Sequence, residues 1–141
     1  MSSGAPTGGA SAPGVYVLDS SVFIRSLRGD TVMAARIAAA SQVYVPSTVL
    51  GELYYGAYSS LTRPDAAAAD VETIEKTVAV LTPDAMTARI YARVKLDLKR
   101  RGLTMPDNDL WIAGIAIQYN VTLAAHDAHF DWISGLRIEQ W

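Results

Sequence analysis

Four acidic residues occupy positions that an α/β fold would bring together: Asp19, Glu52, Asp109 and Asp127. Asp19 ends the apolar run VYVLD, and Asp127 follows the apolar run VTLAA. Both runs have the composition of buried parallel strands, and active sites of open α/β sheets lie outside the carboxyl ends of such strands. Glu52, on the helix after the second strand, and Asp109, in the first turn of a helix beginning near Pro106, are expected at the same edge.

Carboxylates gathered at one point repel one another unless a cation neutralises them. The chain has no cysteine and only two histidines, so oxygen atoms are the available ligands. Oxygen ligands suit Mg²⁺ or Mn²⁺ better than zinc. The four acids therefore predict a divalent-cation site of the kind that activates water.

Each acid also has a structural explanation that the sequence leaves open. Asp19 and Asp127 could cap the segments that follow them, and Asp109 fits the preference for acids at helix N-termini. Glu52 could be a solvated helix position. The histidines that flank Asp127, His126 and His129, could serve as metal ligands or as a general base, or could simply pack.

Strand and helix patterns alternate along the chain. We expect strands at residues 15–19, 42–46, 78–81, 121–125 and 136–141, with helices at 20–30, 31–40, 47–60, 62–76, 82–101 and 106–119. Ser47 is the expected N-cap of its helix, and Gly102 is expected to end the long one. Alternating elements imply right-handed crossovers. The prediction is a three-layer α/β domain with a mostly parallel sheet of about five strands.

Composition limits the class of protein. The chain has 141 residues, half of them hydrophobic, with 12 basic and 14 acidic side chains and a net charge of −2. This excludes a disordered acidic tail, a disulfide scaffold and a protein that coats nucleic acid by bulk charge. No apolar run approaches the ~18–20 residues that span a bilayer. Residues 1–14 are expected to be a flexible leader, and residues 15–141 a single cytoplasmic domain.

Four motifs together resemble PIN-domain ribonucleases, and in particular the VapC-type toxins of toxin–antitoxin pairs. They are VYVLDSSVFI, VPSTVLGELYYGA, PDNDLWIAGIAI and TLAAHDAHF, in the order and spacing of that family. The resemblance implies a PIN-like fold, a Mg²⁺ or Mn²⁺ cofactor, an RNA substrate, a cognate antitoxin and a homodimer. It also gives His129 a packing position beside Phe130.

The resemblance also implies roles for individual residues. Asp19, Glu52, Asp109 and Asp127 take the catalytic positions, with Asp19 and Asp109 as metal ligands. Asp127 and Glu52 complete a second metal site or orient the water, and Ser21 supports the site. The chain departs from the family pattern at Ala125, where Thr or Ser is common.

The expected activity is Mg²⁺-dependent endonucleolytic cleavage of RNA by a metal-activated water. The alternative is a PIN-like module that binds RNA or protein without cutting. A phosphatase of the haloacid dehalogenase type is disfavoured because Ser21 stands where such an enzyme needs a second Asp. No glycine-rich phosphate loop is present, which disfavours nucleotide-driven chemistry.

Two further patterns have both a structural and a functional explanation. Arg89, Arg93 and Arg100 share one face of the long helix, and could contact the RNA backbone or simply be solvated. The helix containing Tyr54, Tyr55 and Tyr58 is rich in aromatic residues. Dimer contacts or core packing are favoured there over base stacking.

Overall fold

Five parallel strands form the centre of the molecule. The structure is a computed structural model and describes residues 14–141, so the expected leader lies outside the described residues except for Gly14. The strands run in the order β3-β2-β1-β4-β5, and all four pairings are parallel. Their bounds are β1 Val15–Leu18, β2 Gln42–Pro46, β3 Ala79–Leu81, β4 Thr122–Ala125 and β5 Ile138–Gln140.

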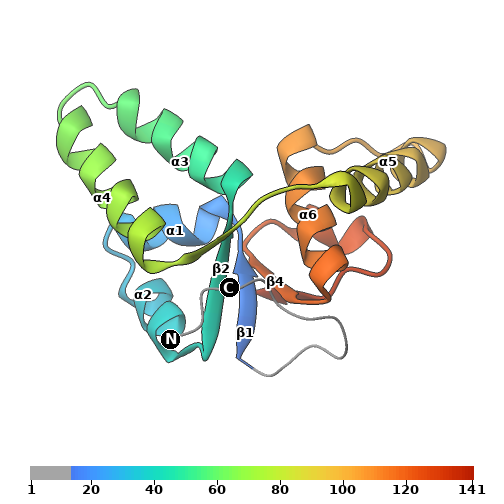
Figure 1. Cartoon of the computed structure of the whole chain (residues 1–141), viewed down its shortest axis with the longest axis horizontal. Helices are drawn as coiled ribbons and strands as arrows, with labels where there is room; N and C mark the ends of the chain where they lie inside the picture. The colour runs from blue at the N-terminus through green and yellow to red at the C-terminus, as the bar shows by residue number, and fades with distance from the viewer. Residues whose placement is uncertain (1–13) are drawn as a thin grey trace.

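Helices cover both faces of this sheet. They are α1 Ser20–Leu27, α2 Thr31–Ala39, α3 Ser47–Tyr58, α4 Pro64–Thr77, α5 Ala85–Arg100 and α6 Asp107–Tyr119, followed by a short 3₁₀ helix, η1, at Ala128–Trp132. In Figure 1, α1 to α4 lie on one side of β1 and β2, and α5 and α6 lie on the other. The predicted three-layer α/β fold is confirmed.

Burial explains why the central strands are apolar along their whole length. Val17 and Leu18 of β1 and Leu123 and Ala124 of β4 are fully buried, because helices cover both faces of the sheet. The fifth strand is shorter than the expected segment 136–141. Most helix bounds agree with the sequence pattern to within a few residues.

One end of α5 and one end of α3 can be compared with the helix ends that the sequence predicts. Gly102 ends α5 as expected, with φ of 72° in the left-handed region. Ser47 is not the N-cap of α3: Pro46 holds that position, and no side chain caps the helix. The reason is that β2 runs directly into α3, so that the helix begins one residue earlier than the capping pattern indicates.

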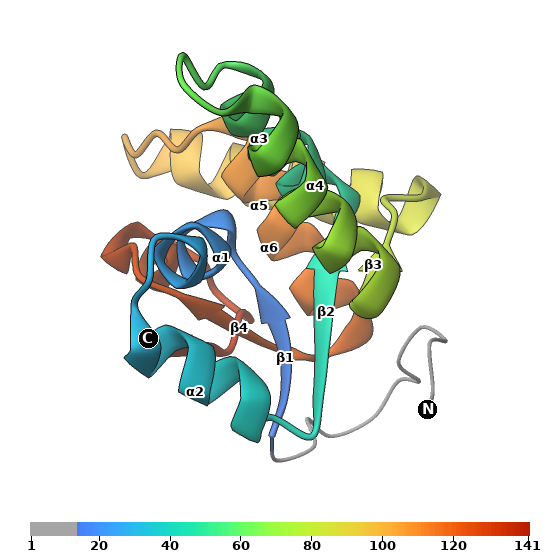
Figure 2. The ribbon, with the colours of Figure 1, turned by 90° about the vertical axis from the view of Figure 1, so that its left-hand side faces the viewer.

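The order of the strands reverses between β1 and β4, where a fold of this kind is expected to have its crevice. From β1 the chain moves outward through β2 to β3, and then crosses to β4 and β5 on the other side of β1. Such a reversal leaves the carboxyl ends of the two adjacent strands uncovered. Figure 2 shows β1 and β2 pointing toward the end of the molecule where α3, α5 and α6 lie. In the part of the chain that the structure describes, no helix is long and apolar enough to span a membrane.

Candidate active site

Asp19 lies at the carboxyl end of β1, where the strand order reverses. Its backbone N–H donates to the carbonyl oxygen of Ala124 at 3.0 Å, which joins the ends of β1 and β4. The side chain is only 5% exposed and makes no capping hydrogen bond to α1. Ser21 Oγ donates to Oδ2 at 3.0 Å, whereas the buried Oδ1 has no hydrogen-bond partner. Capping of α1 therefore does not account for this carboxylate.

Glu52 reaches toward the same point from α3. Its Oε2 accepts a hydrogen bond from Ser20 Oγ at 3.4 Å, and its buried Oε1 has no partner. Burial raises the pKa of Glu52, and the negative charge of Asp19 raises it further. A simple solvated helix position, the structural alternative for this residue, would have neither a buried oxygen nor this coupling.

Asp109 is half-buried in the first turn of α6. Burial raises its pKa from 3.8 to about 6, and the charges of Asp19, Glu52 and Asp127 add to the rise in that order. The neighbouring His129 opposes the rise. The other three acids therefore all lie close enough to Asp109 for their charges to act on it.

Asp127 is the most exposed of the four acids and has a capping role. It occupies the N-cap of η1, where Oδ1 accepts from the His129 backbone N–H at 2.9 Å. The His129 ring lies against Trp132, with Nδ1 3.2 Å from the same oxygen. His129 is thus largely exposed beside Asp127, and the expected packing position beside Phe130 is wrong. Because Asp127 also raises the pKa of Asp19 and of Asp109, it adjoins the other acids while it caps η1.

The four carboxylates form an open cluster rather than a closed cage. Burial raises the pKa of Asp19, an effect that the hydrogen bond from Ser21 opposes and the charge of Asp127 reinforces. Within residues 14–141, no three Asp, Glu, His or Cys side chains are close enough to form a ready-made metal cage. Mg²⁺ keeps several waters and is commonly bound by one or two carboxylates together with substrate phosphates. Unpartnered oxygens of Asp19 and Glu52 beside Asp109 suit that kind of site.

One neighbour of the cluster, Ser20, had little signal in the sequence, whereas His126 was already a candidate there. Ser20 contacts Glu52, although nothing but its place directly after Asp19 could have indicated this. His126 lies at the end of β4, with Nδ1 3.1 Å from Arg25 Nη1 and 3.0 Å from the Trp141 carbonyl oxygen. The ring of His126 thus contacts α1 and the end of β5. Ala125 is fully buried.

The three arginines proposed for RNA contacts lie outside the acidic cluster. Arg89, Arg93 and Arg100 are exposed on α5, and none forms an ion pair with another described residue. Buried Thr87 and Leu98 lie on the opposite side of the same helix, as the helical period requires. These arginines are free to meet an anion, but they do not complete the acidic site.

The aromatic stretch of α3 is only partly packed. Tyr54 is half-buried, and its hydroxyl donates to Glu75 Oε1 at 2.6 Å. Tyr55 and Tyr58 are 76% and 68% exposed, and Leu61 is 99% exposed. Core packing therefore explains Tyr54 in part but does not explain Tyr55 and Tyr58.

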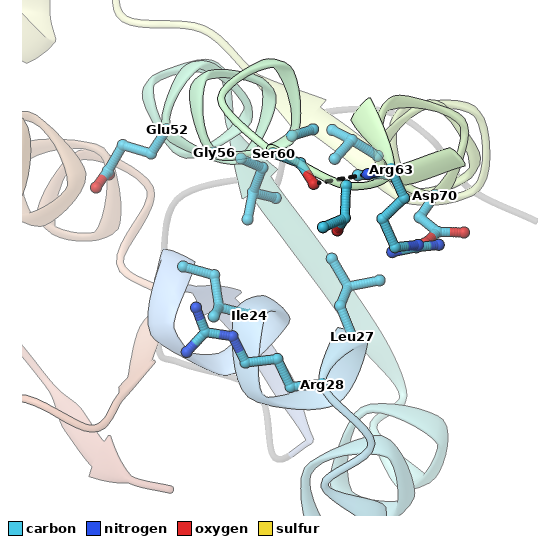
Figure 3. A pocket seen from close by; sticks show the side chains of 13 residues that line it. Ile24, Leu27, Arg28, Glu52, Gly56, Ser60, Arg63 and Asp70 are labelled. Atoms are coloured by element: carbon cyan, nitrogen blue, oxygen red, sulfur yellow. Dashed lines mark hydrogen bonds and ion pairs between the residues drawn. The ribbon is translucent and has the colours of Figure 1, made fainter. Parts of the chain in front are cut away.

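A groove lies between α1, α3 and α4, and Glu52 is the one acid of the cluster that lines it. Its volume is about 310 Å³, and its lining includes Ile24, Leu27 and Leu53. Figure 3 shows Glu52 on one side of this groove, and Arg63 and Asp70 on the far side. Arg28 projects into the groove from the end of α1.

The sequence and fold are similar to those of known proteins. The sequence model of the PIN domain matches residues 16–136. Ribonuclease VapC5 of Mycobacterium tuberculosis is 30% identical over 128 residues, which cover 89% of this chain and 93% of that protein. A chain of VapBC-1 from nontypeable Haemophilus influenzae superposes with a TM-score of 0.81 at 26% identity, over 90% of this chain and 98% of that one. A chain of DNA-bound VapBC from Salmonella typhimurium has a TM-score of 0.78 at 28% identity, over 89% and 97%.

Proposed function

The chain belongs to the PIN-domain family and is related to the VapC ribonucleases, and from this premise we propose that it is a Mg²⁺-dependent endoribonuclease. We place the nuclease domain at residues 15–141 and its action in the cytoplasm, as the toxin of a type II toxin–antitoxin pair. The observation that carries the proposal is the cluster of acids at the crevice. Two of them, Asp19 and Glu52, keep a buried oxygen without a hydrogen-bond partner.

Asp19 and Asp109 are the proposed direct ligands of the metal. The hydroxyl of Ser21 occupies Oδ2 of Asp19 and leaves Oδ1 free to coordinate a cation. Asp109 has a pKa of about 6, so it is mostly ionised at neutral pH and can bind a cation there. Mn²⁺ would suit the same oxygen ligands. Glu52 and Asp127 would complete a second metal site or orient the attacking water.

The proposed reaction is hydrolysis of an RNA phosphodiester bond by an in-line water. A bound Mg²⁺ would lower the pKa of water and relieve the charge on the scissile phosphate. The protein's own part is to hold the carboxylates in place. Asp19 is fixed at the joined ends of β1 and β4, Glu52 by Ser20, and Asp127 by the backbone of η1.

The proposed protein partners are a cognate antitoxin and a second copy of the chain. Solved relatives are VapBC complexes, which supports an antitoxin partner. The groove between α1, α3 and α4 is the place we assign to an antitoxin segment, because it is lined by apolar side chains and reaches Glu52 (Figure 3). Exposed Tyr55 and Tyr58 are candidates for the contact between two copies.

The alternative is a module that binds RNA or protein without cleaving. Such a module has no need for buried carboxylate oxygens that lack hydrogen-bond partners, because each of them costs folding free energy. The observation at Asp19 and Glu52 therefore favours the enzyme.

Cleavage of RNA by the purified chain tests the proposal. We expect cuts in total RNA when Mg²⁺ is added and none in EDTA, with RNA ends identified by sequencing. Asp109→Asn should lower the cleavage rate at least about 100-fold, because it removes a charge that binds the cation. Its circular dichroism spectrum should be unchanged, and its unfolding should remain cooperative.

The matched control is Asp107→Asn, two residues earlier on α6. Asp107 accepts hydrogen bonds from Tyr91 and Lys95 on α5 and is not in the acidic cluster. This variant should keep cleaving. Retained Mg²⁺-dependent cleavage by a folded Asp109→Asn protein would contradict the assignment. Mg²⁺-dependent binding of RNA by the unaltered chain without any cleavage would instead establish the alternative.

A further inference from the structure

A second cavity lies on the far side of α6 from α3, between α5 and the loop that leads into α6. Its volume is about 410 Å³, within the usual range for small-ligand sites. The lining comes from the second half of α5, from loop residues 102–105 and from α6, and consists of Lys95, Leu98, Lys99, Gly102, Leu103, Thr104, Met105 and Leu110.

The shape of this cavity is set by the way α5 ends. Gly102, with φ of 72°, turns the chain, and its N–H donates to the Lys99 carbonyl oxygen at 3.0 Å. The next N–H, that of Leu103, donates to the Leu98 carbonyl oxygen at 2.9 Å. These two bonds form a Schellman motif, which places Leu103 against Leu98. The wall of the cavity is therefore held by the backbone, and no large rearrangement is needed before a ligand enters.

The lining combines an apolar floor with two cations at the rim. Leu98 and Leu110 are almost fully buried, and Leu103 and Met105 are half-buried. Lys95 donates to Asp107 at 3.0 Å. Lys99 is exposed and forms no ion pair with another described residue. An apolar slot beside an ammonium group that has no ion-pair partner suits a nucleobase in the slot and its linked phosphate on the ammonium group.

The position of the cavity relative to the acidic cluster favours RNA as its occupant. Leu110 in the cavity floor directly follows Asp109, so the two sites share the first turn of α6. On α5, Lys95 and Lys99 lie on the flank between the buried face and the row of Arg89, Arg93 and Arg100, so all five cations are on the exposed side of the helix. A twofold contact between two copies centred on the cavity would instead bring like charges together.

We propose that this cavity binds one unpaired nucleotide of the RNA substrate, with its base against Leu98 and Leu103 and an adjoining phosphate on Lys99. The proposal rests on the proposed function, because it assigns a subsite to the same reaction. The nucleotide in the cavity must be unpaired, since a base held in a double helix cannot enter it.

Binding of a defined RNA to the uncleaving Asp109→Asn protein provides the test. The probe is a fluorescein-labelled, single-stranded 12-nucleotide RNA without self-complementarity, followed by fluorescence anisotropy in Mg²⁺. Adding Thr104→Trp to Asp109→Asn should fill the mouth of the cavity and raise Kd about 5- to 30-fold, the loss expected when one base no longer contacts an apolar surface. Adding Lys99→Gln should raise Kd about 3- to 10-fold, whereas Lys76→Gln, which removes an exposed charge on α4, should leave it unchanged.

An abasic scan of the probe separates the cavity from general charge effects. One nucleotide at a time is replaced by an abasic residue. The parent protein should lose affinity at one position more than at the others, and Thr104→Trp should abolish that difference. A 12-base-pair duplex of the same sequence should bind more weakly than the single strand. If Thr104→Trp does not fold, the abasic scan is carried out on the parent Asp109→Asn protein and on its Lys99→Gln variant, and these two scans test the proposal.

Several outcomes would overturn the inference. They are a parent protein that does not bind the probe, equal Kd values for the parent, Thr104→Trp and Lys99→Gln, and a scan without a preferred position. A change in oligomeric state in Thr104→Trp with unaltered RNA affinity would show that a second copy covers the cavity. Cleavage by the chain with Asp109 intact is followed separately, and its absence contradicts the proposed function alone.

Discussion

At the scale of single residues, the four acids differ in their burial and in the groups that donate hydrogen bonds to them. Asp19 is buried and bound by Ser21, Glu52 is half-buried and bound by Ser20, and Asp127 is exposed and bound by a backbone N–H. The pKa values of Asp19 and Glu52 are raised, and that of Asp109 is raised to about 6. Residues of one chemical type therefore have unequal affinities for a proton, which is characteristic of functional sites.

The raised pKa of Asp109 predicts an effect on stability. The folded protein binds a proton at Asp109 up to pH of about 6, whereas the unfolded chain releases it near 3.8. The carboxylate therefore costs the folded state free energy above pH of about 6, and this cost disappears as pH falls below about 4. Without divalent metal, Asp109→Asn should raise the free energy of unfolding at pH 7 by about 1 kcal/mol, after allowance for partial exposure.

Urea unfolding in EDTA between pH 4 and pH 8 measures this effect. The gain from Asp109→Asn should be greatest above pH 7 and should vanish near pH 4. Asp107→Asn is a control of opposite sign, because hydrogen bonds from Lys95 and Tyr91 lower the pKa of Asp107. Its carboxylate stabilises the fold above the unfolded pKa, and this contribution is lost as pH falls through the lowered value. If the free energy of unfolding of Asp109→Asn rises by the same amount at every pH, the raised pKa of Asp109 is not the cause of the effect.

At the scale of elements, the contact between α5 and α6 positions Asp109. Gly114 of α6 faces Thr87 of α5, a fully buried residue that takes part in the capping box with Asp84. A Cβ at Gly114 would lie 3.3 Å from Thr87 Cγ2 and 3.5 Å from Thr87 O. The two helices can cross this closely because position 114 has no side chain.

Enlarging Gly114 should therefore separate the two helices. Gly114→Val should lower the free energy of unfolding by about 2 kcal/mol, because its methyl groups have no free space against Thr87. The control is Gly51→Ala on α3, where no heavy atom lies within 4 Å of the added Cβ. It should leave stability unchanged or raise it by up to about 1 kcal/mol, since alanine is the better helix former. Equal urea midpoints for the two variants would mean that the crossing is not tightly packed.

At the scale of the whole molecule, the net charge of −2 is an average over unlike regions. Four of the fourteen acids lie at the crevice, whereas Arg89, Arg93, Lys95, Lys99, Arg100 and Arg101 gather on α5 and at its end. Arg101 is engaged with Asp97, but the three arginines proposed for RNA contacts have no ion-pair partner among the described residues. A mildly acidic protein can thus present a strongly cationic surface to a polyanion.

This distribution predicts how cleavage depends on salt. Each phosphate contact that is lost should reduce the slope of log affinity against log salt by about 0.7 for a single strand. Replacing Arg93 and Arg100 by Gln should therefore flatten the slope by about 1.4, measured as kcat/KM for RNA between 50 and 300 mM KCl. The control replaces Lys76 and Arg137 by Gln. This removes two exposed charges that lie shortly before β3 and β5, at the amino-terminal ends of the strands and away from the acids. An equal slope in both double variants would mean that the α5 face does not contact RNA.

The sequence by itself determined the alternation of strands and helices and the end of α5 at Gly102, and it predicted the chemical type of the proposed site. These depend on short-range physics: apolar periodicity, the freedom of glycine at positive φ, and the preference of oxygen ligands for hard cations. Ser47 shows the limit of such rules, because the direct entry of β2 into α3 overrode a favourable capping residue.

Only the tertiary structure decided which carboxylate oxygens are buried, that Asp127 caps η1 while its charge acts on Asp109, and that His129 is exposed. The same holds for the cavity between α5 and α6. Burial and charge coupling depend on distances between residues far apart in the chain, and the strand order sets those distances. No local pattern contains that information, because one motif could face the crevice or solvent depending on how the sheet is assembled.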